Sequence, residues 1–151
     1  MTVTVDDAEG TRTLGRRLGE RLFAGAVVAL IGELGAGKTF LVKAIAEGLG
    51  IANSAVVSSP TFVLIQEYDA RLPIYHFDAY RLATEAEFAD LGAHEYFGGT
   101  GVSLVEWADK VPNCLPAERL EIRIRTIGEM ARRFDLTAFG ARFEELVRAL
   151  R

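Results

Sequence analysis

Apolar side chains recur every three to four residues in several stretches, as they do along one face of an amphipathic helix. The clearest case is Leu14, Leu18 and Leu22, which have charged side chains between them. Thr84 and Glu87 form a capping pattern that opens a further short helix. The helices predicted in this way cover residues 11–23, 38–49, 84–91 and a C-terminal segment that contains Phe143, Leu146, Val147 and Leu150.

Strand patterns alternate with these helices. Residues 26–31, Ala-Val-Val-Ala-Leu-Ile, are apolar throughout and too few for a whole helix. Such a run is typical of a strand that is buried on both faces of a parallel sheet. Residues 62–68 and 74–77 are joined by five residues, which favours an antiparallel pair. Further strands are predicted at residues 56–57, 102–105, 120–124 and 134–139.

The order of these elements predicts the fold class. Helices and strands alternate without an internal repeat or a low-complexity linker. We therefore expect an α/β protein, a three-layer α/β/α fold with a mixed, partly parallel sheet. A chain of 151 residues fits a single domain that covers residues 1–151.

Composition and charge narrow the range of partners. Lys and Arg number 17 against 21 Asp and Glu, so the formal net charge is −4. This argues against a broad basic surface, and we expect no DNA partner. Because no apolar run is long enough to span a membrane and the N-terminus is polar and acidic, we expect a cytoplasmic protein without a membrane partner. The single cysteine, Cys114, rules out an internal disulfide and a cysteine-rich metal site.

The strongest chemical signal is the glycine-rich segment 32–39, Gly-Glu-Leu-Gly-Ala-Gly-Lys-Thr, between a predicted buried strand and a predicted helix. It satisfies G-x-x-x-x-G-K-[ST], the phosphate-binding loop (P-loop) of P-loop NTPases. In such a loop Lys38 would reach the β- and γ-phosphates, and the Thr39 hydroxyl would ligate Mg²⁺. Backbone N–H groups at the helix N-terminus would hold phosphate oxygens. The backbone positions assigned to this cradle are Gly35, Ala36, Gly37 and Phe40.

Two acids follow predicted strands directly. Glu106 comes after residues 102–105, at the position of the metal-binding acid of P-loop folds, and Asp78 comes after residues 74–77. The alternative for each is an ordinary surface carboxylate. Thr61 lies in a predicted loop and could bind Mg²⁺ or the γ-phosphate as switch threonines do.

Two further side chains near these acids carry weaker signals. Trp107, the only tryptophan, follows Glu106 and could stack on a base or a partner side chain, with core packing as the alternative. His76 alternates with apolar residues, which favours a hydrogen-bonded structural role over that of a catalytic base.

Several motifs in order resemble the bacterial TsaE (YjeE) family, P-loop ATPases of tRNA threonylcarbamoyladenosine biosynthesis. After the P-loop come residues 59–62, Ser-Pro-Thr-Phe, residues 76–82, His-Phe-Asp-Ala-Tyr-Arg-Leu, and residues 105–107, Val-Glu-Trp. Upstream, residues 11–15, Thr-Arg-Thr-Leu-Gly, are similar to the family's entry helix. The resemblance spans nearly the whole chain.

The resemblance implies an Mg²⁺-dependent ATPase that joins the TsaB–TsaD pair and does not itself transfer the threonylcarbamoyl group. Contact with tRNA would be mainly indirect, through that complex. We expect ATP turnover to reset the complex between catalytic cycles. The residues to which the resemblance gives a catalytic role are Lys38, Thr61, Asp78 and Glu106, and those to which it gives the metal are Thr39 and Glu106.

The resemblance also implies nucleotide contacts outside the loop. Thr11 and one C-terminal arginine, Arg132 or Arg133, would lie near the nucleotide, together with Trp107. Glu33 and Phe40 depart from the residues most common in the family. The backbone cradle requires neither side chain.

Three other functions remain open at this point. A small-molecule kinase would use the same loop, but no arginine-bearing lid or acceptor pocket is recognisable. A GTPase would carry an Asn-Lys-x-Asp motif, which is absent. A nucleotide-gated binding module with vestigial hydrolysis would differ only in a slow rate that partners do not change.

Overall fold

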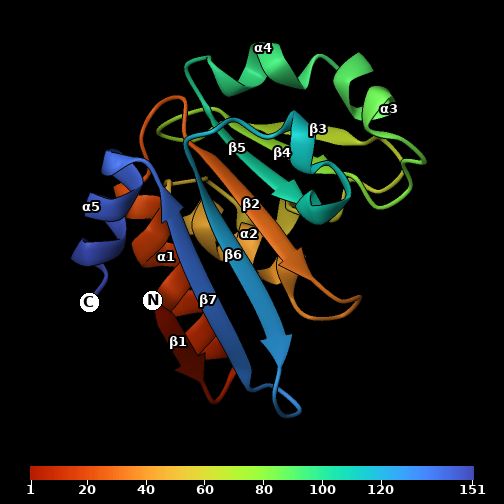
Figure 1. Cartoon of the computed structure of the whole chain (residues 1–151). Coiled ribbons are helices and arrows are strands. Elements are labelled where there is room, and N and C mark those ends of the chain that lie inside the picture. The colour runs from red at the N-terminus through yellow and green to blue at the C-terminus, as the bar shows by residue number, and fades with distance from the viewer.

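The computed structural model describes residues 1–151 and contains one seven-stranded sheet (Figure 1). The strand order is β1-β7-β6-β2-β5-β4-β3. The four strands from β6 to β4 are parallel to one another, whereas β3, β7 and β1 pair antiparallel to their neighbours. The strand bounds are Thr2–Val5 (β1), Val27–Gly32 (β2), Ile65–Tyr68 (β3), Ile74–Asp78 (β4), Val102–Glu106 (β5), Arg119–Thr126 (β6) and Arg132–Phe139 (β7).

Helices pack on both faces of the sheet. The bounds are Ala8–Arg21 (α1), Lys38–Gly48 (α2), Glu85–Asp90 (α3), Ala93–Phe97 (α4) and Ala141–Ala149 (α5), and short 3₁₀ turns cover Ser54–Val56, Ala108–Lys110 and Pro112–Cys114. Apolar residues of α1, α2 and α5 share one core cluster, and those of α3 and α4 share another. Figure 1 shows these two sets of helices on opposite sides of the sheet. The three-layer α/β/α fold with a mixed sheet is therefore confirmed.

Strand β2 lies at the centre of this arrangement. Val28 and Leu30 belong to the core cluster beneath α1 and α2. Val27, Ala29 and Ile31 point the other way, into the cluster beneath α3 and α4. The uninterrupted apolar run is thus explained, because a central strand with parallel neighbours has no solvent-facing side. This strand fixes the start of the glycine-rich loop.

Glycines bring α1 and α2 into backbone contact. A Cβ on Gly19 would stand 2.2 Å from the carbonyl oxygen of Ile45, and one on Gly48 would stand 2.2 Å from that of Arg16. Side chains at these two positions would push the helices apart. Because Gly15 faces Ala44 and Gly19 faces Gly48, the two helices run in the same direction. Helix α1 thereby supports the helix that follows the glycine-rich loop.

Some local predictions were wrong or incomplete. Residues 56–57 form no strand, because the Asn53 side chain accepts a hydrogen bond from the backbone N–H of Ala55 and caps a 3₁₀ turn. Helix α1 begins three residues before the predicted start, because the Asp7 side chain caps it by accepting from Gly10 N–H. Strand β1 and helix α4 were not predicted.

None of the helices combines the length and the apolar character that crossing a membrane would require.

Candidate nucleotide-binding site

The glycine-rich loop turns sharply between β2 and α2. Gly35 and Gly37 have φ angles of +80° and +103°, in the left-handed region that glycine adopts without strain. Gly37 is the N-cap residue of α2, and no side chain caps this end of the helix. Its first N–H groups therefore point, with the positive end of the helix dipole, toward the loop. This is the geometry of an anion-binding helix N-terminus.

Lys38 is folded back over this loop. Its ammonium donates hydrogen bonds to the carbonyl oxygens of Gly32, at 2.6 Å, and Glu33, at 2.8 Å. The same nitrogen lies 4.0 Å from the centroid of the Trp107 ring, a cation–π contact. Burial lowers the pKa of Lys38, and the nearby carboxylates, Glu106 foremost, oppose that shift.

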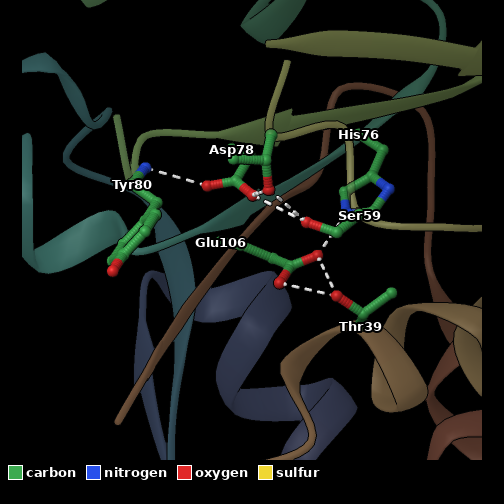
Figure 2. Close-up of polar contacts among 7 residues, drawn as sticks. Thr39, Ser59, His76, Asp78, Tyr80 and Glu106 are labelled. Carbon is green, nitrogen blue, oxygen red and sulfur yellow. Dashed lines mark hydrogen bonds and ion pairs between the residues drawn. The ribbon is translucent and has the colours of Figure 1, made fainter. Parts of the chain in front are cut away.

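Glu106, the last residue of β5, is 2% exposed and points toward α2. The Thr39 hydroxyl lies 2.9 Å from each of its carboxylate oxygens, so its single proton is shared between them. The imidazole of His76 makes a 2.5 Å contact from Nε2 to Oε2 of the same carboxylate. Figure 2 shows this carboxylate between the threonine and the histidine.

Asp78 ends the adjacent strand β4 and is the register partner of Glu106. Its Oδ2 accepts hydrogen bonds from the hydroxyls of Ser59 and Thr61, both at 2.9 Å. Its Oδ1 accepts from the backbone N–H of Tyr80 at 2.8 Å (Figure 2). The segment around Thr61 is therefore tied to the strand end by this buried carboxylate, which is 2% exposed.

These elements surround one cavity of about 330 Å³. Its lining includes Leu34, Gly35, Gly37, Lys38, Thr39, Phe40, Ser59, Thr61, Asp78, Tyr80, Glu106 and Trp107. A larger cavity, of about 540 Å³, lies between β6 and the glycine-rich loop and shares Leu34 and Trp107, but it contains neither of the two strand-end acids. We therefore identify the smaller cavity as the candidate site. Trp107 has a φ of +59° and stacks on Tyr80 with ring centroids 4.8 Å apart.

The two candidate arginines lie on opposite sides of β7. Arg132 donates from Nε to the carbonyl oxygen of Ala36 in the glycine-rich loop, at 2.9 Å. Arg133 instead pairs with Asp135, at 3.2 Å. Only Arg132 is therefore in contact with the loop.

Thr11, like Arg133, is not brought to the cavity or into contact with the loop. It is buried on α1, one turn before Gly15, and the parallel packing of α1 and α2 puts it level with the first turn of α2. It does not line the cavity.

Two members of the site, Ser59 and Tyr80, were not predicted. Ser59 contacts Asp78 through its hydroxyl, and Tyr80 contributes both a backbone donor and the ring beneath Trp107. A signal existed for Tyr80 alone, since it follows Asp78 by two residues. A backbone N–H two residues after an acid is a frequent carboxylate partner.

A glycine-rich loop follows the buried parallel strand β2 and opens a helix, and acids end β5, which pairs with β2, and β4, the next strand along. This arrangement defines a P-loop protein of the α/β class. The family model described as "Threonylcarbamoyl adenosine biosynthesis protein TsaE" matches residues 5–134. The chain therefore belongs to the TsaE family.

Individual relatives agree with this assignment. The chain is 47% identical over 143 residues to the tRNA threonylcarbamoyladenosine biosynthesis protein TsaE of Bacillus subtilis (strain 168), covering 94% of this chain and 88% of that protein. It is 43% identical over 122 residues to the protein of the same name from Treponema pallidum (strain Nichols), covering 81% and 89%. The crystal structure of Bacillus subtilis YdiB superposes with a TM-score of 0.86 at 40% identity, covering 99% of this chain and 93% of that one.

Proposed function

We propose that this chain is an Mg²⁺-dependent ATPase that serves tRNA threonylcarbamoyladenosine biosynthesis in the cytoplasm, through the TsaB and TsaD proteins. The observation that carries the proposal is the meeting of Lys38, Thr39 and Glu106 in one cavity at the N-terminal end of α2. These are the groups that bind phosphate and a divalent cation in P-loop proteins. The names of the relatives support the pathway.

The loop fits the phosphates of ATP. Free N–H groups at the start of α2 suit anionic oxygens, and the left-handed Gly35 and Gly37 let the backbone approach closely. Lys38 would exchange its two carbonyl partners for phosphate oxygens. Arg132 stabilises the loop by donating a hydrogen bond from Nε to the carbonyl oxygen of Ala36.

The donor set also fits Mg²⁺. This ion takes oxygen ligands, and in nucleotide sites it needs only one or two from protein because phosphates and waters complete its shell. The Thr39 hydroxyl and the Glu106 carboxylate, already 2.9 Å apart, are the two protein oxygens that would hold it. The ion would neutralise charge that develops on the phosphates.

Hydrolysis further requires that the attacking water be positioned near the γ-phosphate. Asp78 and Thr61 face the same cavity, and their hydrogen bond makes the Thr61 segment a candidate γ-phosphate sensor. In this scheme a γ-phosphate would compete with Asp78 for the Thr61 hydroxyl. The segment would then change position between the nucleotide states.

The direct test is the rate of ATP hydrolysis of the purified chain with and without Mg²⁺. We expect a low, Mg²⁺-dependent rate, and we expect Lys38→Ala to weaken ATP binding and turnover together, because the lysine contacts phosphate in ground and transition states. Lys43→Ala is the matched control, since this lysine lies on the same helix and does not line the cavity. Unchanged ATP affinity in Lys38→Ala would show that the loop is not the site.

The role of the partners needs a separate assay. Adding TsaB and TsaD should raise the hydrolysis rate, and a rate indifferent to them would favour a binding module or a kinase instead. We further propose that turnover resets the TsaB–TsaD complex, with tRNA contacted mainly through that complex. Full multiple-turnover tRNA modification with a nonhydrolysable ATP analogue would contradict the reset.

A further inference from the structure

A buried histidine lies directly behind the proposed metal carboxylate. His76 is 0% exposed and stands at the middle of β4. Its side chain points to the same face of the sheet as Asp78, because residues two apart on a strand share a face. It does not line the cavity. A fully buried imidazole that does not line the cavity is not placed to act as the general base.

The contact between His76 and Glu106 has a defined direction. An ionised carboxylate only accepts hydrogen bonds, so the proton of the 2.5 Å contact belongs to Nε2 of the imidazole. The other ring nitrogen, Nδ1, is buried and has no hydrogen-bond partner. The bond to Glu106 is thus the only polar contact of this side chain, which would be an unusual arrangement for a histidine that served the core alone.

Glu106 has few other restraints. Its carboxylate receives hydrogen bonds from Thr39 and His76 and from no other side chain. Thr39 is itself a proposed metal ligand and would share its oxygen with the cation. Of the two groups that hold the carboxylate, His76 alone stays outside the proposed coordination shell.

From this geometry we propose that His76 is a positioning residue for the divalent cation. Its Nε2–H holds Oε2 of Glu106 and so leaves Oε1, which like Oε2 lies 2.9 Å from the Thr39 hydroxyl, as the oxygen that would face the metal. The inference rests on the proposed function, in which Glu106 and Thr39 bind that metal. Hydrogen bonds of this kind to a ligating side chain typically change metal affinity by about 10- to 100-fold.

The test compares three substitutions by titrating MnCl₂ into the complex with ADP and measuring free Mn²⁺ by electron paramagnetic resonance. His76→Gln keeps a donor near the position of Nε2, whereas His76→Asn is polar but too short to reach Glu106. We expect His76→Asn to weaken Mn²⁺ binding by about 10-fold or more and His76→Gln to stay within about threefold of wild type. ADP affinity in EDTA should be unchanged in both variants.

Glu106→Gln separates this inference from the proposed function. One outcome is that Glu106→Gln weakens Mn²⁺ binding while His76→Asn binds Mn²⁺ with the same affinity as His76→Gln. In that case the positioning role of His76 is wrong and the metal site stands. If Glu106→Gln leaves Mn²⁺ affinity unchanged, the metal assignment itself fails. Should His76→Asn not fold, which urea unfolding will reveal, His76→Leu replaces it with the same expectation.

Discussion

Replacing Asp78 with asparagine should loosen the segment that carries Thr61. In the native chain the carboxylate accepts from Ser59, Thr61 and the backbone of Tyr80. The two hydroxyls also lie 2.7 Å apart, but each has one proton, so donation to Asp78 uses both. Asparagine can keep the Tyr80 contact with its carbonyl oxygen. It leaves the hydroxyls to pair with an uncharged amide.

The size of the effect follows from the hydrogen bonds that change. A bond to a charged acceptor contributes about 1.5–3 kcal/mol and a neutral one about 0.5–1.5 kcal/mol. The loss is therefore about 1 kcal/mol for each hydroxyl, or about 2 kcal/mol for both. Solvent screening reduces this little, because Asp78 is 2% exposed. Local opening of the segment should become about 30-fold more frequent, since 1.4 kcal/mol corresponds to a factor of ten.

Hydrogen exchange measures this opening directly. The N–H of Leu64 donates to the carbonyl oxygen of Pro60 at 2.6 Å and reports on the segment. Its exchange should accelerate about 30-fold in Asp78→Asn, while amides of residues 27–32 in the central strand keep the wild-type rate.

Single hydroxyl variants refine the test. Thr61→Val should accelerate exchange about 30-fold, because it removes one whole hydrogen bond to a charged acceptor, about 2 kcal/mol. Ser58→Ala is the control, since that hydroxyl makes no hydrogen bond to another side chain. Equal exchange of Leu64 in wild type and Asp78→Asn would refute the view that this carboxylate holds the segment.

Two further predictions concern stability. Gly19→Ala should lower the free energy of unfolding, measured in urea, by about 3 kcal/mol, because the new Cβ would stand 2.2 Å from the carbonyl oxygen of Ile45. Gly98 has open space around it, so the control Gly98→Ala should change the free energy of unfolding by less than about 0.5 kcal/mol. The Glu47 carboxylate accepts hydrogen bonds from Arg12, which lower its pKa from 4.5 to about 2. This stabilisation is present above pH 4.5 and is lost as the pH falls toward 2, so the urea midpoints of wild type and Glu47→Gln should differ at pH 7 and converge in acid. A constant difference across that range would exclude the ion pair as its cause.

The strand-end acids were predictable from the sequence alone. Glu106 and Asp78 each follow an apolar run, and parallel pairing then brings the two residues into register at one edge of the sheet. Their hydroxyl partners were not predictable in the same way. The segment of Ser59 and Thr61 takes its conformation from a contact with Asp78 about 17 to 19 residues further along the chain.

Whether Arg132 or Arg133 contacts the glycine-rich loop depends on the residue at which β7 begins. The apolar pattern predicted a strand from residue 134, which left both arginines in a loop. Strand β7 begins at Arg132. Since alternate residues share a face, Arg132 then points with buried Phe134 and Leu136 toward the glycine-rich loop, and Arg133 points away.

The contacts of Lys38 imply that phosphate binding, as proposed above, would be an exchange of partners. The ammonium is already satisfied by two carbonyl oxygens of its own loop and by the ring of Trp107. An incoming anion would therefore have to interact with the lysine more favourably than these three contacts together. A single phosphate group has few oxygens with which to compensate, whereas a longer polyphosphate reaches the lysine while the helix N–H groups hold its other oxygens. If the loop binds phosphate as proposed, it would therefore favour a longer phosphate chain over a single phosphate group, whatever base or sugar that chain carries.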